Sequence, residues 1–193
     1  MKEDLLRTKA MSLDIALGVS AAVGITAGVI LSLNMDSSAL ISLCGTEQKL
    51  ALAAEGEWIQ VFLSSFIGVG AMLLAAFFLG FCALSQPVEL LLVAFRGLGL
   101  GVCVRGVYLT TNVIISMAAF LPYAIFSTGV LVLAVKEAFG LSMRYLGLSA
   151  TTENRLGIKN EIRDYTAKFM IYTLLLAALA MADAFLARSI GSM

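Results

Sequence analysis

The chain of 193 residues is 60% hydrophobic and 13% charged, with a mean hydropathy of +0.96. This composition excludes a soluble globular domain and indicates an integral membrane protein. The formal net charge is zero and histidine is absent, which argues against a nucleic-acid-binding surface and removes the usual general base and commonest metal ligand. We therefore expect an all-α bundle of membrane-spanning helices, in one domain, that binds no metal or other cofactor.

The first expected span covers residues 13–33, about the 20 apolar residues that cross a bilayer as a helix. Its apolar run is longer than the roughly 7 to 15 residues of a secretory signal peptide. Gly24 and Gly28 form a G-x-x-x-G pair, with Gly18 and Ala22 as further small residues. This spacing predicts a face that another helix can approach closely, although small residues are also simply common in membrane helices.

An acidic hydrophilic loop follows at residues 34–57, with four acidic side chains against Lys49 alone. Within it, residues 46–54 could form a short helix lying on the membrane surface. Trp58 stands where the chain re-enters the membrane, which suits an indole at the headgroup level. The loop therefore leads directly into a second span.

The second span is expected at residues 58–84 and the third at residues 88–109. Only a few residues connect them. Pro87 bends the chain there and fits the first position of a new helix, where its missing N–H is not needed. We therefore expect spans two and three to form a tight antiparallel hairpin.

The third span carries three ionisable side chains, Glu89, Arg96 and Arg105. A charge near the bilayer centre costs roughly 2.5 to 3.5 kcal/mol even on the lenient insertion scale, so the rest of the chain must shelter them. Gly97 and Gly101 offer a second small-residue face. The span could be broken between these glycines, as in some transporters, but we favour a continuous and closely packed helix.

The fourth span is expected at residues 111–138, with a kink at Pro122, because proline removes a backbone donor and clashes with the preceding turn. A basic loop follows at residues 139–168. The last span, residues 169–187, contains Asp183. An N-terminus in the cytoplasm and a C-terminus outside place most lysines and arginines on the cytoplasmic side, which is the usual distribution.

Depth along the bilayer limits which buried charges can meet. At about 1.5 Å per helical residue, Arg105 lies roughly 25 Å and Asp183 roughly 22 Å from the cytoplasmic face, so we expect them to pair. Arg96 could reach Glu89 or Asp14. These groups either line a polar path for a solute or proton or fix how the spans pack. Opposite signs at matching depths favour the packing role.

No enzyme motif is present. The chain lacks H-E-x-x-H and G-x-S-x-G motifs. The glycine-rich run GLGLG neither follows a strand nor carries the Lys-Ser/Thr pair that holds nucleotide and magnesium in a phosphate loop. We therefore expect a protein without enzymatic activity.

An ordered set of short motifs runs through the middle of the chain: Leu79-Gly80, Pro87, Arg96-Gly97, Gly101 and Leu121-Pro122. This set, within residues 72–133, resembles the stage II sporulation protein M family of integral membrane proteins. The chain departs from the family pattern at Arg105, where an apolar residue is expected, and in its first loop.

The resemblance implies a role in the bacterial cell membrane during engulfment of the forespore. There, the family member holds two cell-wall hydrolases, stage II sporulation proteins D and P, in one membrane complex and is not itself the hydrolase. Relatives outside spore-forming bacteria have no assigned role, and some have been suspected of transport.

Two functional hypotheses follow. The first is a membrane scaffold, surrounded by lipid, that binds partner helices or forms a homodimer through its two glycine faces, Gly24/Gly28 and Gly97/Gly101. The second is a small permease or permease subunit with a polar path near Arg96, Arg105 and Asp183.

Overall fold

The computed structural model describes residues 2–36, 52, 55–82, 84–110, 113–148 and 155–191. These residues form five long helices and no strand: α1 (Lys2–Leu33), α4 (Trp58–Leu79), α5 (Gln86–Tyr108), α6 (Val113–Leu148) and α7 (Arg155–Gly191). Each helix contains a stretch of 21 to 31 residues that is long and apolar enough to cross a membrane. The predicted all-α class with five candidate membrane helices is confirmed.

The outer surface of the bundle is apolar. Ile30, Leu91, Ile114 and Leu174 lie on four different helices and are each more than 60% exposed. A water-soluble protein rarely carries so continuous an apolar surface, whereas the acyl chains of a bilayer cover it without cost. The protein is therefore a multi-pass membrane protein.

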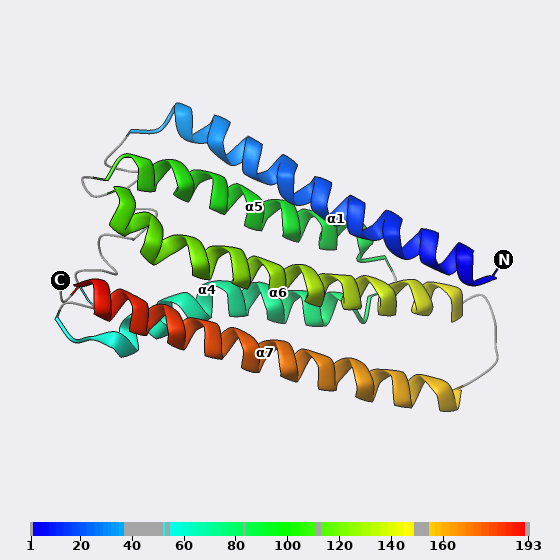
Figure 1. Ribbon diagram of the computed structural model, residues 1–193. Coiled ribbons are helices and arrows are strands. Elements are labelled where there is room, and N and C mark those ends of the chain that lie inside the picture. The colour runs from blue at the N-terminus through cyan, green and yellow to red at the C-terminus, as the bar shows by residue number, and fades with distance from the viewer. Residues whose placement is uncertain are drawn as a thin grey trace.

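The helices are arranged as two pairs joined by α6 (Figure 1). In the first pair, α1 packs against α5, and in the second, α4 packs against α7. α6 contacts all four of the other helices. Its Leu131, together with Leu17 of α1 and Leu176 of α7, is fully buried in the common core.

The tight hairpin expected between spans two and three does not form as a packed unit. α4 ends at Leu79 and α5 begins at Gln86, so the connection is short. Contact between these two helices is nevertheless slight, because α5 packs mainly on α1 and α6, and α4 mainly on α7 and α6. A short connection limits how far two helices can separate at one end, but the fit of their side chains decides which neighbours they choose.

The helices extend beyond the expected spans. Most of the basic segment at residues 139–168 is helical, because α6 continues to Leu148 and α7 begins at Arg155. α1 likewise begins at Lys2 rather than at residue 13. Hydropathy marks where a helix is apolar, not where its hydrogen bonding ends, and no proline interrupts these polar turns.

The structure also bears on the two prolines. Pro87 lies in the first turn of α5, as expected. That helix is continuous through its glycine-rich part, so the unbroken form we favoured is confirmed. α6 continues without interruption through Pro122.

The surface helix expected at residues 46–54 lies outside the described residues, apart from Leu52.

Candidate functional site

The two glycine faces predicted from the sequence pack against each other. On α1, a methyl group added at Gly24 would overlap the backbone carbonyl of Ala94 in α5. A methyl group at Gly28 would overlap the carbonyl of Leu98, one helical turn further along. The α1 backbone therefore lies directly against the α5 backbone at two successive turns.

The α5 side of this contact is equally close. Methyl groups at Gly97 and Gly101 would meet the backbone carbonyl oxygens of Ala21 and Ile25, respectively. Gly24, Gly28, Gly97 and Gly101 thus form one internal contact, which we call the glycine interface. Binding of a partner helix or a second copy through these faces would therefore require α1 to separate from α5.

Two serines extend the glycine interface and were not singled out from the sequence. Ser20 Oγ donates a hydrogen bond of 2.7 Å to the backbone carbonyl of Leu90 across the interface. Ser32, in the last turn of α1, is fully buried. Both continue the four-residue spacing of the glycines, which was the available signal, since serine is also a small residue. Gly18 lies elsewhere, because a methyl group there would meet no atom within 4 Å.

Arg96 joins α5 to α6 near the middle of the bundle. Its Nη2 donates to Ser127 Oγ at 2.8 Å and its Nε to Thr128 Oγ1 at 3.2 Å. It does not make the expected contact with Glu89 or Asp14, since the hydroxyls of α6 lie at its own level. These hydroxyls stabilise the guanidinium without neutralising its charge.

Asp183 joins α7 to α4. Its Oδ2 accepts a hydrogen bond of 2.7 Å from Ser65 Oγ, and both residues are buried. The backbone carbonyl of Ser65 in turn accepts a hydrogen bond from the Tyr123 hydroxyl of α6. Tyr123 lies within electrostatic range of both Arg96 and Asp183. We call the resulting set the mid-bundle polar layer: Arg96, Ser127, Thr128, Tyr123, Ser65 and Asp183.

The expected ion pair between Arg105 and Asp183 is not among the contacts of the described residues. Arg105 lies in the last turn of α5, and its Nη1 is buried without a hydrogen bond to the described part of the chain. The two residues were matched by depth alone. Their helices are not neighbours, because α6 lies between α5 and α7 (Figure 1).

A second polar group lies where α4 ends, α5 begins and α6 nears its end. Glu89 is fully buried there, with Oε1 2.6 Å from Ser85 Oγ. Ser85 Oγ is 3.1 Å from Ser142 Oγ, which donates to the backbone carbonyl of Cys82 at 2.8 Å. Glu89 Oε2 is also buried and has no hydrogen-bond partner among the described residues. These four residues form the Glu89 cluster.

Two ion pairs lie at the same end of the bundle and are partly exposed. Lys136 Nζ is 2.6 Å from Asp14 Oδ1 and joins α6 to α1. Lys168 Nζ is 2.7 Å from Glu137 Oε2 and joins α7 to α6. Both lysines are therefore engaged by carboxylates other than Glu89.

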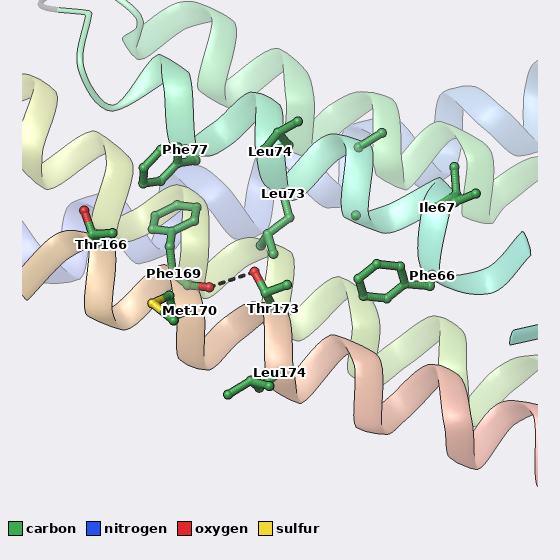
Figure 2. A pocket seen from close by; sticks show the side chains of 12 residues that line it. Phe66, Ile67, Leu73, Leu74, Phe77, Thr166, Phe169, Met170, Thr173 and Leu174 are labelled. Atoms are coloured by element: carbon green, nitrogen blue, oxygen red, sulfur yellow. Dashed lines mark hydrogen bonds between the residues drawn. The ribbon is translucent and has the colours of Figure 1, made fainter. Parts of the chain in front are cut away.

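An apolar groove of about 670 Å³ runs between α4 and α7 (Figure 2). Its two threonines, Thr166 and Thr173, donate their hydroxyl protons to carbonyls of their own helix, as Figure 2 shows for Thr173 and Phe169. The groove therefore presents almost no free polar group. We call it the α4–α7 groove; it is lined by Phe66, Ile67, Gly70, Ala71, Leu73, Leu74, Phe77, Thr166, Phe169, Met170, Thr173 and Leu174.

Within the described residues, no three acidic or cysteine side chains come together in a way that could hold a metal ion. No protein-family model, curated protein or solved structure matches this chain. The interpretation of the site therefore depends on its own geometry and chemistry.

Proposed function

We propose that this protein is a non-enzymatic scaffold of the bacterial cell membrane. In this role it resembles stage II sporulation protein M and holds peptidoglycan hydrolases in one complex during engulfment. The observation that carries the proposal is the α4–α7 groove. Ile67, Leu74, Met170 and Leu174 on its walls are each more than half exposed, so a helix of another membrane protein can reach it from within the bilayer.

The shape and chemistry of the groove favour a helix as its occupant. Gly70 and Ala71 leave room on α4 for close approach of a backbone, while the large apolar side chains around them supply contact area. The threonine hydroxyls are already bonded within α7, so no polar partner is required. The membrane-anchored hydrolases D and P, which the family resemblance implies, would meet this requirement with apolar anchors.

The orientation belongs to the same proposal. With the N-terminus in the cytoplasm and the C-terminus outside, the acidic segment at residues 34–57 faces the cell wall, where the hydrolases act. The distribution of lysine and arginine supports this orientation, since cytoplasmic segments of membrane proteins carry most of these residues.

Copurification from native membranes tests the scaffold role. Gly70→Leu fills the groove, whereas Gly68→Leu is a matched control, because residue 68 is on the same helix, is exposed and has no neighbour within 4 Å of an added methyl group. We expect wall hydrolases to copurify with the wild type and G68L but to be lost with G70L at equal protein level. Recovery of a transport ATPase in place of hydrolases, or equal hydrolase recovery with both variants, would contradict the proposal.

A permease is the second candidate, and the mid-bundle polar layer is the observation that favours it. Buried ionisable groups inside a membrane bundle often mark transport paths. In this layer, however, Arg96 and Asp183 are both hydrogen bonded to neighbouring helices, which suits a packing role. A solute flux that is lost in Asp183→Asn, while the stability of the bundle is unchanged, would favour the permease.

A further inference from the structure

We propose that Glu89 is a proton-binding site, in which a neutral carboxylic acid group holds together the end of α4, the start of α5 and the end of α6. The proposal concerns the Glu89 cluster and does not depend on the scaffold function. It follows from the burial of the carboxyl group, from the absence of a cation paired with it among the described side chains, and from the arrangement of hydroxyl groups around it.

Burial is the first argument. Glu89 has no exposed surface, and its Oε2 lacks any hydrogen-bond partner among the described residues. An ionised carboxyl group would place part of its negative charge on this oxygen, away from water. An unpaired buried charge is far more costly than a neutral oxygen in the same position, and such groups become neutral instead.

The surrounding charges give the second argument. Among the described side chains, the titratable and charged groups at this end are Asp14 of α1, Lys136 and Glu137 of α6, Glu161, Arg163, Asp164, Tyr165 and Lys168 of α7, and the exposed thiol of Cys82. Each of the two lysines is paired with another carboxylate, at 2.6 and 2.7 Å. Tyr165 donates its hydroxyl proton to the backbone carbonyl of Phe77 at 3.0 Å. Arg163 is exposed and lies 4.0 Å from Asp164, so none of these described cations is paired with Glu89.

The hydrogen-bond pattern gives the third argument. Glu89 Oε1 and Ser85 Oγ are 2.6 Å apart, so in the neutral form a hydroxyl on Oε1 can donate to Ser85 Oγ. The hydroxyls of Ser85 and Ser142 then both donate to the carbonyl of Cys82, at 2.9 and 2.8 Å. The three hydroxyl protons, of Glu89, Ser85 and Ser142, are thus matched to three hydrogen bonds. In the ionised form, Ser85 must turn its only proton toward Glu89 and abandon the Cys82 carbonyl.

Loss of the proton therefore weakens the contact between the three helix ends. Cys82 is exposed and lies outside the candidate spans Trp58–Leu79 and Gln86–Tyr108, so water can reach the chain next to the cluster and accept the proton when the pH rises. An unfolded chain exposes the glutamate and releases this proton already at acid pH. Rising pH consequently favours the unfolded chain over the folded bundle until Glu89 itself ionises.

Infrared spectroscopy and thermal unfolding of the purified full-length protein test this inference. We expect a carbonyl band of a protonated carboxylic acid at neutral pH that is absent in Glu89→Gln and present in Glu137→Gln, the matched control at a partly exposed carboxylate. We also expect the unfolding temperature of the wild type to fall with rising pH, and that of E89Q to fall distinctly less, because an amide cannot ionise.

The proposal is overturned if the wild type shows no protonated acid band at neutral pH, or if E89Q keeps both the band and the pH dependence of the wild type. Asp183 is the other buried acid among the described side chains. Its band is identified with Asp183→Asn. If E89Q does not accumulate, the wild type and D183N decide the matter: a band that persists in D183N supports the proposal, and its loss contradicts it.

Discussion

Ser65 Oγ donates a hydrogen bond of 2.7 Å to Asp183 Oδ2, and this bond ties α4 to α7 inside the bundle. Removal of the donor by Ser65→Ala leaves a buried carboxyl oxygen without that partner. We expect a loss of about 1 to 3 kcal/mol in the free energy of unfolding. Thermal or SDS-induced unfolding in detergent measures this loss.

The matched control for this bond is the adjacent Ser64. Its hydroxyl donates to the carbonyl of Val61 within the same helix, at 2.9 Å, and the side chain is exposed. Ser64→Ala should leave the stability within about 0.5 kcal/mol of the wild type. Equal effects of the two substitutions would show that the bond between Ser65 and Asp183 contributes nothing specific.

The glycine interface predicts a strong difference between two glycines of the same helix. Gly24→Ala places a methyl group on the carbonyl of Ala94, so α1 and α5 must move apart, at a cost of about 1 to 3 kcal/mol. Gly18→Ala adds the same group where no atom lies within 4 Å. There the better helix propensity of alanine should leave stability unchanged or raise it by up to about 1 kcal/mol. Unfolding measurements on both variants make the comparison.

The variant G24A also tests whether the Gly24 face of α1 mediates self-association. Because the face is filled by α5, we expect G24A to lower stability without changing the oligomeric state, as measured by light scattering in detergent. A shift from dimer to monomer in G24A, with unfolding unchanged, would instead assign the face to a contact between copies.

The ion pair between Lys136 and Asp14 is partly exposed, with side-chain exposures of 38% and 53%. Such pairs are worth about 0.2 to 1 kcal/mol and weaken with salt. We expect Lys136→Glu to destabilise the bundle by repulsion from Asp14. The second substitution Asp14→Lys should restore most of the loss by reversing the pair. Unfolding at low and high salt follows both effects, and a double variant no better than the single one would argue against the pair.

Cys82 reports the orientation of the chain in the membrane. It lies exposed in the connection between α4 and α5. The proposed orientation places this connection in the cytoplasm. A variant that retains Cys82 as its only cysteine should therefore react with a membrane-impermeant maleimide only after the cells are permeabilised. Labelling in intact cells would require the opposite orientation.

The sequence was a good guide to features that depend on position along one helix. The first expected span coincides with the apolar part of α1, residues 13–33, because apolar length is a property of the local sequence. The small residues at Gly24 and Gly97 were also correctly identified as packing positions. Both features follow from helix geometry alone.

Features that depend on which helices are neighbours were not predicted. Arg105 and Asp183 were expected to pair because their depths matched, but α6 lies between their helices (Figure 1). Hydropathy indicates the depth of a residue along the membrane normal, but it contains no information on where its helix lies in the plane of the membrane. The serine and threonine partners of Arg96 and Asp183 were missed for a related reason. A serine or threonine hydroxyl in a membrane helix can always bond to the backbone of its own helix. It joins two helices only when the neighbouring helix places a charged side chain beside it.

The pairing of helices has a consequence for biogenesis. Each close pair joins two helices that do not follow one another in the chain, α1 with α5 and α4 with α7. A nascent chain that has completed α1 and α4 therefore holds two helices whose partners are still unsynthesised, with the face of Gly24 open to lipid or to membrane chaperones. Ser65 of α4 accepts the hydrogen bond from Tyr123 once α6 is inserted. Its own hydroxyl can donate to Asp183 only when α7 is inserted as well. Packing of these described helices therefore waits for α7, the last of them to be synthesised.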